Sequence, residues 1–424
     1  MNYQQALAYI HSLLQFGSKP GLDRVSRLVS LAGNPEKDLK FIHIAGTSGK
    51  GSTASYCASI LEKSGYKVGL YTSPYVTDFR ERFIINGEMI GKDDFCSLCE
   101  FLKEKVELLN AEGVIITEFE FNTVLGLLWF KQQGCDIVCL EVGMGGRFDA
   151  TNIIPCPEVS VITRIGLDHT AYLGTSLKEI DFEKCGIVKG GKTVTYPDQK
   201  SEALLEIERI CKCKGSKLYT PNLADITDIE LNVGGSSFKF EGKSYVLNMS
   251  GEHQIHNAVT AVCAVNLLSE SGFKISDDAI YEGLFNVKCP ARLEILSKAP
   301  LIIIDGAHNS DKISSLYEVV KCFSGEIISV CGMLRDKDYA LAVEKIAPLC
   351  KKIYTVSPDN PRALSAEEFA AECEKFCGEV TAMDCISDAV SAAYSQLKDG
   401  DVFLCWGSLY IAGNVRSEIL RLLK

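Results

Sequence analysis

The chain has 424 residues, of which 46% are hydrophobic and 23% charged, and its formal net charge is −11 at pH 7. This composition excludes wholesale disorder, and the length predicts two or three domains. The acidic balance argues against a nucleic-acid or general polyanion partner, so any phosphate ligand must be held by a local site.

The sequence predicts a protein of the cytoplasm that does not enter the membrane. No apolar run approaches the roughly 18 residues that cross a bilayer. Residues 1–16 lack the basic start and the small-residue cleavage site of a signal peptide, and they read as an amphipathic helix. The eighteen cysteines are scattered through apolar runs, where reduced thiols behave as small hydrophobes. The pair Cys96 and Cys99 has no second pair at zinc-site spacing, so we expect no metal or redox role for it.

The N-terminal part alternates short apolar strands with helical segments. We expect strands at 41–46, 67–73, 136–143 and 159–166, and helices at 92–110, 119–133 and 177–189. This alternation predicts a parallel sheet with helices on its faces. Residues 225–250 alternate with period two and contain glycine turns, which predicts a small antiparallel meander. Two helices follow, at 253–271 and 277–286.

A second α/β rhythm begins after Cys289-Pro290. We expect strands at 301–307, 327–333, 352–358 and 401–408, each followed by a helical pattern. The fold class is therefore α/β. It combines an N-terminal P-loop-type parallel-sheet domain over residues 1–296, carrying the antiparallel subregion, with a smaller Rossmann-like α/β domain over residues 297–424.

The strongest chemical signal is the run Gly46, Thr47, Ser48, Gly49, Lys50, Gly51 and Ser52. It follows a predicted strand and opens a helix, which is the context of a phosphate-binding loop. Glycines let several N–H groups point at one anion, the helix N-terminus adds its dipole, and Lys50 adds a charge. Ser52 or Thr53 offers a hydroxyl to Mg²⁺. The pattern is not the strict P-loop, since Gly51 separates the lysine from the hydroxyl, and the alternative is a glycine-rich turn with an exposed lysine.

Three more candidates follow the later strands of this domain. Glu141 ends a strand where parallel sheets bind ligands, which suits a Mg²⁺ ligand, and Arg147 follows in a glycine-rich loop as a fork for carboxylate or phosphate. His169 is a candidate ligand for a second metal ion, although a histidine beside an aspartate is more often a structural pair. The amine of Lys184 can condense with CO₂ to a carbamate, but nothing in its local spacing distinguishes it from a solvated lysine.

The second domain contributes Asp305 and His308 within the run Asp-Gly-Ala-His-Asn. An acidic residue at a strand end, followed by small residues and a helix start, can reach a ribose or an amine across a domain cleft. Asn257 and Arg292, which precede the boundary, can address a nucleotide from the linker side. Asn309 can equally be only the N-cap of its helix.

Nine segments occur together in one order: GTSGKGS, TSPYVTDFRERFIING, EVGMGGRFDATN, GLDHTAYLG, EKCGIVK, HQIHNAV, PARLE, DGAHN and GSLYIAGNVR. On these the chain resembles the folylpolyglutamate synthase/dihydrofolate synthase family of the ATP-dependent muramyl-peptide ligase superfamily. The resemblance runs from about residue 20 to 415. It implies a ligase that uses ATP to join L-glutamate to a folate or to dihydropteroate through an acyl phosphate. It also implies an ATP-binding central domain with the folate site over residues 1–296 and a glutamate-ligase domain over 297–424.

The same resemblance implies a role for individual residues. The loop from Gly46 to Ser52 would bind ATP together with Asn257, Arg292 and Asp305. The metal ligands, for two expected Mg²⁺ ions, would be Ser73, Glu141 and His169, with Ser52 a further candidate. Lys184 falls on the position that is carbamylated. The catalytic set would be Lys50, Lys184, Arg292 and His308. The substrate side would comprise Arg82, Phe119, Glu120, Gly146, Arg147, Phe148 and Asp149.

The chain departs from the family pattern at three positions without losing a proposed ligand. Ser48 replaces a usual Asn, Tyr75 a usual His, and Cys185 a usual Ala beside the proposed carbamate. Two alternatives remain open, namely a ligase for muramyl peptides and a P-loop ATPase switch. We expect a monomer. The sequence leaves open whether the enzyme has one or both of the family's activities and which folate form it prefers.

Overall fold

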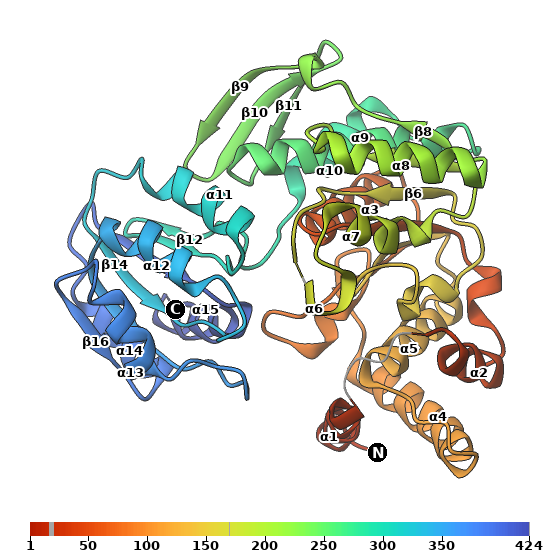
Figure 1. Ribbon diagram of the computed structural model, residues 1–424, viewed down its shortest axis with the longest axis horizontal. Helices are drawn as coiled ribbons and strands as arrows, with labels where there is room; N and C mark the ends of the chain where they lie inside the picture. The colour runs from red at the N-terminus through yellow and green to blue at the C-terminus, as the bar shows by residue number, and fades with distance from the viewer. Residues whose placement is uncertain (17–20, 169, 424) are drawn as a thin grey trace.

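The computed structural model describes residues 1–16, 21–168 and 170–423. Among these residues the strands form three sheets, of eight, three and six strands. In Figure 1 the C-terminal sheet and its helices lie to the left of the N-terminal body, and the three-stranded sheet projects above both. The predicted α/β class with an antiparallel subregion is confirmed.

The large sheet is parallel at its centre and antiparallel at one edge, in the order β4-β3-β2-β5-β1-β6-β7-β8. Its strands are β1 (Phe41–Ala45), β2 (Val68–Tyr71), β3 (Phe83–Ile85), β4 (Glu88–Met89), β5 (Ile137–Glu141), β6 (Val159–Ile162), β7 (Lys192–Thr195) and β8 (Lys217–Tyr219). β3 pairs antiparallel with β2 and β4, whereas the other neighbours pair in parallel. β1 and β5 are buried along their whole length, as central parallel strands must be.

Helices cover both faces of this sheet. They are α1 (Tyr3–Ser12), α2 (Asp23–Leu31), α3 (Lys50–Lys63), α4 (Lys92–Ala111), α5 (Glu118–Gln132), α6 (Thr170–Leu173), α7 (Leu177–Lys184), α8 (Ser201–Lys214), α9 (Glu252–Ser269) and α10 (Asp277–Asn286). The predicted helix at 177–189 ends earlier, because the chain tightens into a 3-10 turn at Cys185–Ile187 and then extends.

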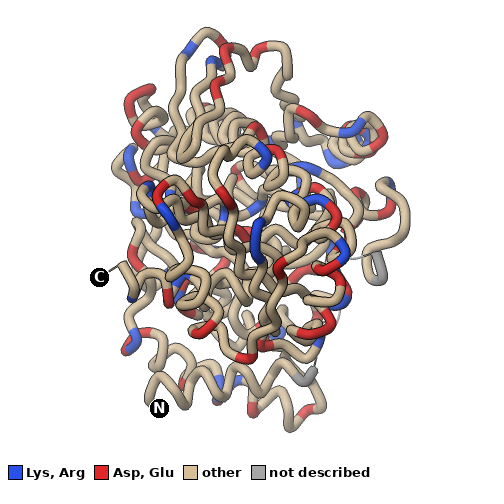
Figure 2. Tube along the Cα trace, turned by 90° about the vertical axis from the view of Figure 1, so that its left-hand side faces the viewer, with Lys and Arg blue, Asp and Glu red and all other residues tan. Residues whose placement is uncertain are grey.

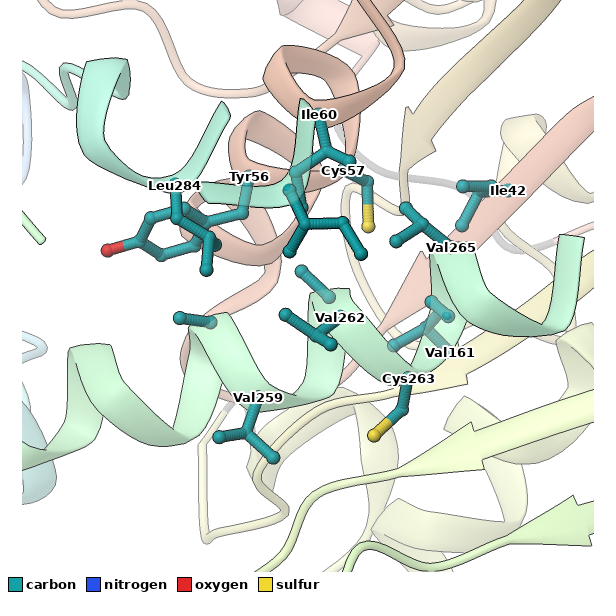
Figure 3. Packing of buried hydrophobic residues seen from close by; sticks show 14 of the residues in the cluster. Ile42, Tyr56, Cys57, Ile60, Val161, Val259, Val262, Cys263, Val265 and Leu284 are labelled. Atoms are coloured by element: carbon teal, nitrogen blue, oxygen red, sulfur yellow. The ribbon is translucent and has the colours of Figure 1, made fainter. Parts of the chain in front are cut away.

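The face that carries α3 holds the core nearest the phosphate loop. α3 packs between the sheet and the pair α9 and α10, and the apolar side chains of Tyr56, Ile60, Val262 and Leu284 interdigitate there (Figure 3). The opposite face is covered by α1, α2, α4 and α5. Because α3 is held on both sides, its N-terminus has a fixed position at the end of β1.

The remaining chain builds the meander and the C-terminal sheet. The meander is β9 (Ile226–Asn232), β10 (Gly235–Phe240) and β11 (Lys243–Leu247). The C-terminal order is β12-β13-β17-β14-β15-β16, antiparallel at β12 and parallel elsewhere. Its strands are β12 (Glu294–Lys298), β13 (Leu301–Ile304), β14 (Ile327–Cys331), β15 (Cys350–Thr355), β16 (Val380–Ala382) and β17 (Val402–Trp406), and its helices are α11 (Ser310–Val320), α12 (Tyr339–Ile346), α13 (Ala366–Cys373), α14 (Ile386–Ser395) and α15 (Leu409–Leu422).

The predicted domain division at 296 and 297 falls inside β12, which pairs with β13 of the C-terminal sheet. The C-terminal sheet thus starts at Glu294, and the exact division stays a prediction. The two bodies touch where α15 lies against the loop after β2. A Cβ on Gly413 of α15 would lie 1.8 Å from the carbonyl oxygen of Val76, so the close approach depends on glycine.

The distribution of charged residues and the absence of long apolar helices among the described residues fit the composition. Acidic and basic residues are interspersed along the chain in Figure 2. No described helix is both long and apolar enough to cross a membrane. All eighteen cysteines are free thiols, most of them buried.

A substitution at the α3–α10 contact tests this packing. A Cβ on Gly283 of α10 would lie 2.5 Å from the Cα of Ile60. Gly283→Ala gains a few tenths of a kcal/mol to about 1 kcal/mol in helix propensity, but it forces two backbones apart. We expect a net loss of about 1–3 kcal/mol in the free energy of unfolding, measured by urea denaturation. Glu282→Ala, at an exposed neighbour on the same helix, is the control and should change it by less than about 0.5 kcal/mol. An equally stable Gly283→Ala protein would contradict the packing.

Candidate functional site

The loop between β1 and α3 is held from behind by the loop that follows β6. The N–H groups of Thr47 and Ser48 both donate to the carbonyl of Arg164, at 2.9 and 3.3 Å, and the Thr163 hydroxyl donates to the carbonyl of Ser48 at 2.8 Å. The N–H groups of Thr47 and Ser48 are therefore already bonded within the protein, and the prediction that several N–H groups of the loop point at one anion concerns the others. The groups that remain for an anion belong to the first turn of α3, where N–H groups have no acceptor within the helix.

Gly49 and Asn257 explain why this loop needs glycine. Gly49 has φ of 87°, and a Cβ there would lie 2.2 Å from Oδ1 of Asn257 on α9. Asn257 is buried and also donates to Gln254 at 3.2 Å. The loop thus takes its shape from contact with α9 as well as from its own sequence.

Two lysines that line the cavity share one acceptor in the loop. The ammonium of Lys50 and that of Lys184 both donate to the carbonyl of Gly46, at 3.1 and 2.9 Å. Lys184 is only 3% exposed, and burial, with Lys50 as the second cause, lowers its pKa to about 7. An amine with this pKa is neutral in a large part of its population near neutral pH.

Glu141 ends β5 on the other side of the first turn of α3. Its carboxylate accepts from the N–H of Ser73 at 2.9 Å and lies within van der Waals distance of the Cβ position of Gly51. Burial raises its pKa, and the charge of Lys50 opposes that rise. The hydroxyl-bearing residues Ser52 and Ser73 line the same cavity as this carboxylate.

The C-terminal sheet closes the cavity from the opposite side. At the end of β13, Asp305 accepts from the N–H groups of Leu293 and Ala307, each at 2.7 Å, so both of its carboxylate oxygens hold loops. His308 contacts the carbonyl of Gly306 through Nδ1 at 2.7 Å. That contact requires a proton on Nδ1, which leaves Nε2 as an acceptor, and burial lowers the pKa of His308 well below its usual value.

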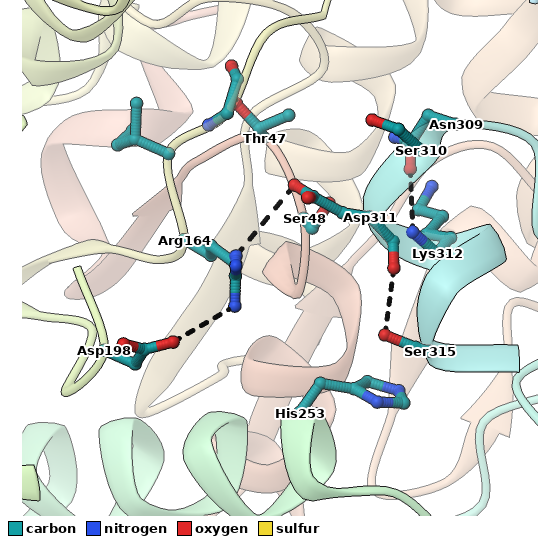
Figure 4. Close-up of polar contacts among 12 residues, drawn as sticks. Thr47, Ser48, Arg164, Asp198, His253, Asn309, Ser310, Asp311, Lys312 and Ser315 are labelled. Carbon is teal, nitrogen blue, oxygen red and sulfur yellow. Dashed lines mark hydrogen bonds and ion pairs between the residues drawn. The ribbon is translucent and has the colours of Figure 1, made fainter. Parts of the chain in front are cut away.

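Polar contacts also join the two bodies across the cavity. Arg164 lies 3.9 Å from Asp311 of α11 and 3.3 Å from Asp198 (Figure 4). Asp168 lies 3.5 Å from the ammonium of Lys337 and 3.4 Å from the amide of Asn309. Asn309 also caps α11, as one of its two predicted roles requires.

Together these segments enclose a cavity of about 870 Å³. Most of the residues predicted for ATP, metal and catalysis line it: Thr47, Ser48, Gly49, Lys50, Gly51, Ser52, Ser73, Glu141, Lys184, Asn257, Arg292, Asp305 and His308. Gly46 lies behind it as the acceptor of the two lysines. His169 lies outside the described residues.

The predicted substrate-side residues do not line this cavity. Arg82 is buried with its guanidinium over the rings of Tyr75 and Phe79, at 5.3 and 5.1 Å. Glu120 pairs with Arg24 at 2.9 Å and caps α5 through Thr117.

The rest of this set adjoins the cavity wall. A Cβ on Gly143, which lines the cavity, would meet the ring of Phe119 at 2.4 Å, and Asp149 accepts from the N–H of Met144 at 2.9 Å. Gly146 packs against the carbonyl of Lys184.

Arg147 stands beside aromatic rings at the surface. Its guanidinium lies over the rings of Phe148 and Phe182, at 4.7 and 5.2 Å, and both rings are exposed. These side chains lie outside the cavity, and Arg147 also lies 3.7 Å from Glu183.

Comparisons with known proteins agree with this arrangement. The Mur ligase middle domain matches residues 44–265, and the Mur ligase glutamate ligase domain matches residues 291–409. A dihydrofolate synthase/folylpolyglutamate synthase of Bacillus subtilis is 35% identical over 428 residues, covering 98% of this chain and 99% of the relative. The chain belongs to the folylpolyglutamate synthase/dihydrofolate synthase family. The resemblance found in the sequence is thereby confirmed.

Solved structures of the family share the whole fold. Escherichia coli FolC in complex with DHPP and ADP matches with a TM-score of 0.85 at 29% identity, covering 100% of this chain and 99% of that one. Mycobacterium tuberculosis folylpolyglutamate synthase complexed with ADP and AMPPCP matches with a TM-score of 0.88 at 28% identity, covering 98% of both chains.

Several residues that line the cavity were given no role from the sequence. Arg164 was only part of a motif, and Lys312, Lys337 and His253 were not singled out. Arg164 carries a local signal, because it follows a strand end. Lys312 carries none, since a lysine in the first turn of a helix resembles any solvated residue.

A buried carboxyl beside Lys184 makes stability depend on pH. Asp181 is fully buried, its Oδ1 accepts from the Cys185 thiol at 3.1 Å, and its Oδ2 has no hydrogen-bond partner among the described residues. Burial raises its pKa to about 7, against about 3.9 in an unfolded chain. Between these values the folded state binds more protons, so the free energy of unfolding falls as pH rises.

Asp181→Asn removes this titration. We expect it to raise the free energy of unfolding by about 1–3 kcal/mol at pH 8, and to have a much smaller effect at about pH 3, where Asp181 is mostly protonated in both states. Denaturant unfolding at the two pH values measures it. Asp399→Asn, at an exposed position, is the control. A change of the same size at both pH values would contradict the assignment.

Proposed function

We propose that this chain is an ATP-dependent ligase that joins L-glutamate to the carboxyl group of a folate, of dihydropteroate, or of both, through an acyl phosphate. The observation that carries the proposal is the single cavity lined by a phosphate loop from one sheet and by Asp305 and His308 from the other. The relatives that cover nearly the whole chain carry the names of these two activities.

The chemistry requires a cavity with two chemically different ends. A carboxylate is a poor electrophile, and phosphorylation by ATP supplies a leaving group. The carboxylate oxygen attacks the γ-phosphorus and ADP leaves; the glutamate amine then attacks the acyl carbon and phosphate leaves. Lys50 and Arg292 lie on the phosphate side, and they offset the charge of the transferring phosphoryl group.

The donor set at the first turn of α3 fits Mg²⁺. This ion prefers oxygen ligands, usually one or two carboxylates together with water and phosphate oxygens. Glu141 supplies a buried carboxylate, and Ser52 and Ser73 supply hydroxyls on the same cavity wall. No cluster of three or more His, Cys, Asp or Glu side chains stands among the described residues, so the fit rests on this oxygen set, with His169 as the further ligand of the proposal. Mg²⁺ would supply charge neutralisation to the phosphates.

Lys184 is suited to carbamylation. Only a neutral amine reacts with CO₂, and the lowered pKa of about 7 provides that form. Burial shields the product, and the carbamate replaces a cation by an anion close to Lys50. We propose that it acts as an oxygen ligand at the magnesium site.

The chemistry of the side chains indicates where the glutamate and the folate ring would bind. Neutral His308, with Nε2 as an acceptor, suits the glutamate amine, which must lose a proton before it attacks. The folate ring would lie toward Phe119, Arg147 and Phe148, whose aromatic and cationic surface suits stacking. We expect the enzyme to act as a monomer in the cytoplasm.

Two parallel assays on one wild-type preparation test the function. With ATP, Mg²⁺ and L-glutamate, we expect ADP release that depends on dihydropteroate, on a tetrahydrofolate monoglutamate, or on both, together with a ligated product seen by mass spectrometry. Release that requires a nucleotide-linked muramyl peptide instead would establish the first alternative. Release indifferent to every acceptor would establish the ATPase switch.

Lys50→Ala tests the phosphate loop within the same assay. The ammonium makes one hydrogen bond among the described residues, to the Gly46 carbonyl, and Lys50 is not among the buried core residues, so its removal opens no core cavity. We expect kcat to fall by about 10²–10³-fold with an unchanged melting temperature. Lys63→Ala, at the exposed far end of the same helix, is the matched control and should retain activity. Wild-type turnover in Lys50→Ala would refute the loop assignment.

Lys184→Ala tests the carbamate. We expect loss of activity, partial recovery with added acetate, which replaces the carbamate oxygens in the space left by the lysine, and loss of a carbamate signal seen by NMR of the wild type in ¹³C-bicarbonate. Lys178→Ala, exposed on the same helix, should show no dependence on acetate. A fully active Lys184→Ala protein without acetate would rule the carbamate out.

A further inference from the structure

Lys312 is a cavity lysine to which neither the sequence motifs nor the proposed reaction gives a role. It lies in the first turn of α11, across from Thr47 and Ser48 (Figure 4). Its ammonium is 3.4 Å from Nε2 of His308, the nitrogen that the Nδ1 contact leaves as an acceptor. This contact orients the lysine but provides no opposite charge, since neutral His308 cannot neutralise it.

Three cations from three separate segments meet in this part of the cavity. Lys50 comes from α3, Arg292 from the segment before β12, and Lys312 from α11. Among the described residues none of the three forms an ion pair with a carboxylate. Three carboxylates face these cations, and each has contacts of its own. Glu141 accepts from the N–H of Ser73, Asp305 accepts from two backbone N–H groups, and Asp168 lies against Lys337 and Asn309.

The energetic consequence is a cluster of like charges in a cavity where each side chain is only partly exposed. Burial, then Arg292 and then Lys50 lower the pKa of Lys312 well below its usual value, while Asp168 and Asp305 oppose the shift. Such a cluster is unfavourable in the free protein, and a multiply charged anion that touches all three groups removes the repulsion.

We propose that Lys312 is a third cation that binds the γ-phosphoryl group of ATP while that group passes to the substrate carboxylate. The proposal rests on the proposed ligase function. The carboxylate oxygen forms a bond to the γ-phosphorus, the bond to the β,γ-bridging oxygen breaks, and ADP leaves with the electron pair. Lys312 donates a hydrogen bond to a non-bridging γ-oxygen and exchanges no atoms.

Two observations favour a phosphoryl ligand over the carboxylate of the incoming glutamate. The cations that most affect Lys312 are Arg292 and Lys50, and Lys50 belongs to the phosphate loop. A phosphoryl group also carries enough charge to pair with three cations, whereas a carboxylate carries one. Lys312 lies on α11 of the C-terminal body and Lys50 on α3 of the N-terminal body. A γ-phosphoryl group bound by both lysines would therefore be held by both bodies.

The free protein should respond to loss of Lys312 in the opposite way from loss of a structural residue. Lys312→Gln removes an amine whose charged form is disfavoured by burial and by Arg292 and Lys50, so we expect an equal or higher melting temperature without ligand. The variant should bind AMPPCP, a non-hydrolysable ATP analogue, about tenfold more weakly, and ADP within about twofold of wild type, since only AMPPCP carries a γ-phosphate.

Calorimetric titration of Lys312→Gln, Lys312→Met and Lys312→Arg with AMPPCP and with ADP, beside melting curves, tests the proposal. Both neutral variants should lose AMPPCP affinity and kcat without a change in KM for glutamate, and Lys312→Arg should recover part of both. Lys351→Gln, an exposed lysine of the same sheet paired with Glu326, is the control.

Three outcomes would overturn the proposal. They are unchanged AMPPCP affinity in both neutral variants, equal losses for ADP and AMPPCP, and a raised KM for glutamate with unchanged AMPPCP affinity, which would place the glutamate carboxylate at Lys312. Failure of the proposed function is separate, because it would appear as wild-type protein that neither binds AMPPCP nor ligates glutamate.

Discussion

The constraint on which this structure depends is the confinement of charged side chains in one cavity between two mainly parallel sheets. Burial is the first cause of the shifted pKa values of Lys184, Glu141, His308 and Lys312, and neighbouring charges modify the result. The chain carries a net charge of −11, yet cations outnumber available anions where phosphates would bind. The net charge of the chain therefore does not indicate the charge of the ligand. The cluster of cations in the cavity indicates an anionic ligand.

Carboxylates at and beside the cavity hold neighbouring segments of the chain in place. Asp305 fixes the loops that carry Leu293 and Ala307, and Asp149 accepts from the Met144 N–H and the Thr151 hydroxyl. Each carboxylate thus positions a segment that lines or adjoins the cavity. Asp305 still acts on Lys312 through its charge, but it forms no ion pair with it. Parallel strands make this arrangement possible, because the loops that follow their carboxyl ends all lie at the same edge of the sheet.

Elements and sites with a signal in neighbouring residues were predicted from the sequence. Contacts between residues that are distant in the sequence were not. The buried strands β1, β5, β13 and β17 were predicted because each is a continuous apolar run, whereas β8, with exposed or half-buried residues, was not. The glycine loop was found from its own spacing. Its attachment to Arg164, and the placing of Lys312 opposite Lys50, come from the packing of distant segments, which no spacing encodes.

The cavity charge also bears on what holds the two bodies together. The ion pairs between Arg164 and Asp311 and between Asp168 and Lys337 are long and partly hydrated, and such pairs each contribute about 0–1 kcal/mol. The close contact between Gly413 and Val76 packs the two bodies together but neutralises none of the cavity charge. Repulsion between Lys50 on one body and Lys312 on the other opposes these contacts. An anion bound between the two lysines converts that repulsion into attraction on both sides. On the role we propose for Lys312, the nucleotide phosphates would belong to the interface as well as to the reaction.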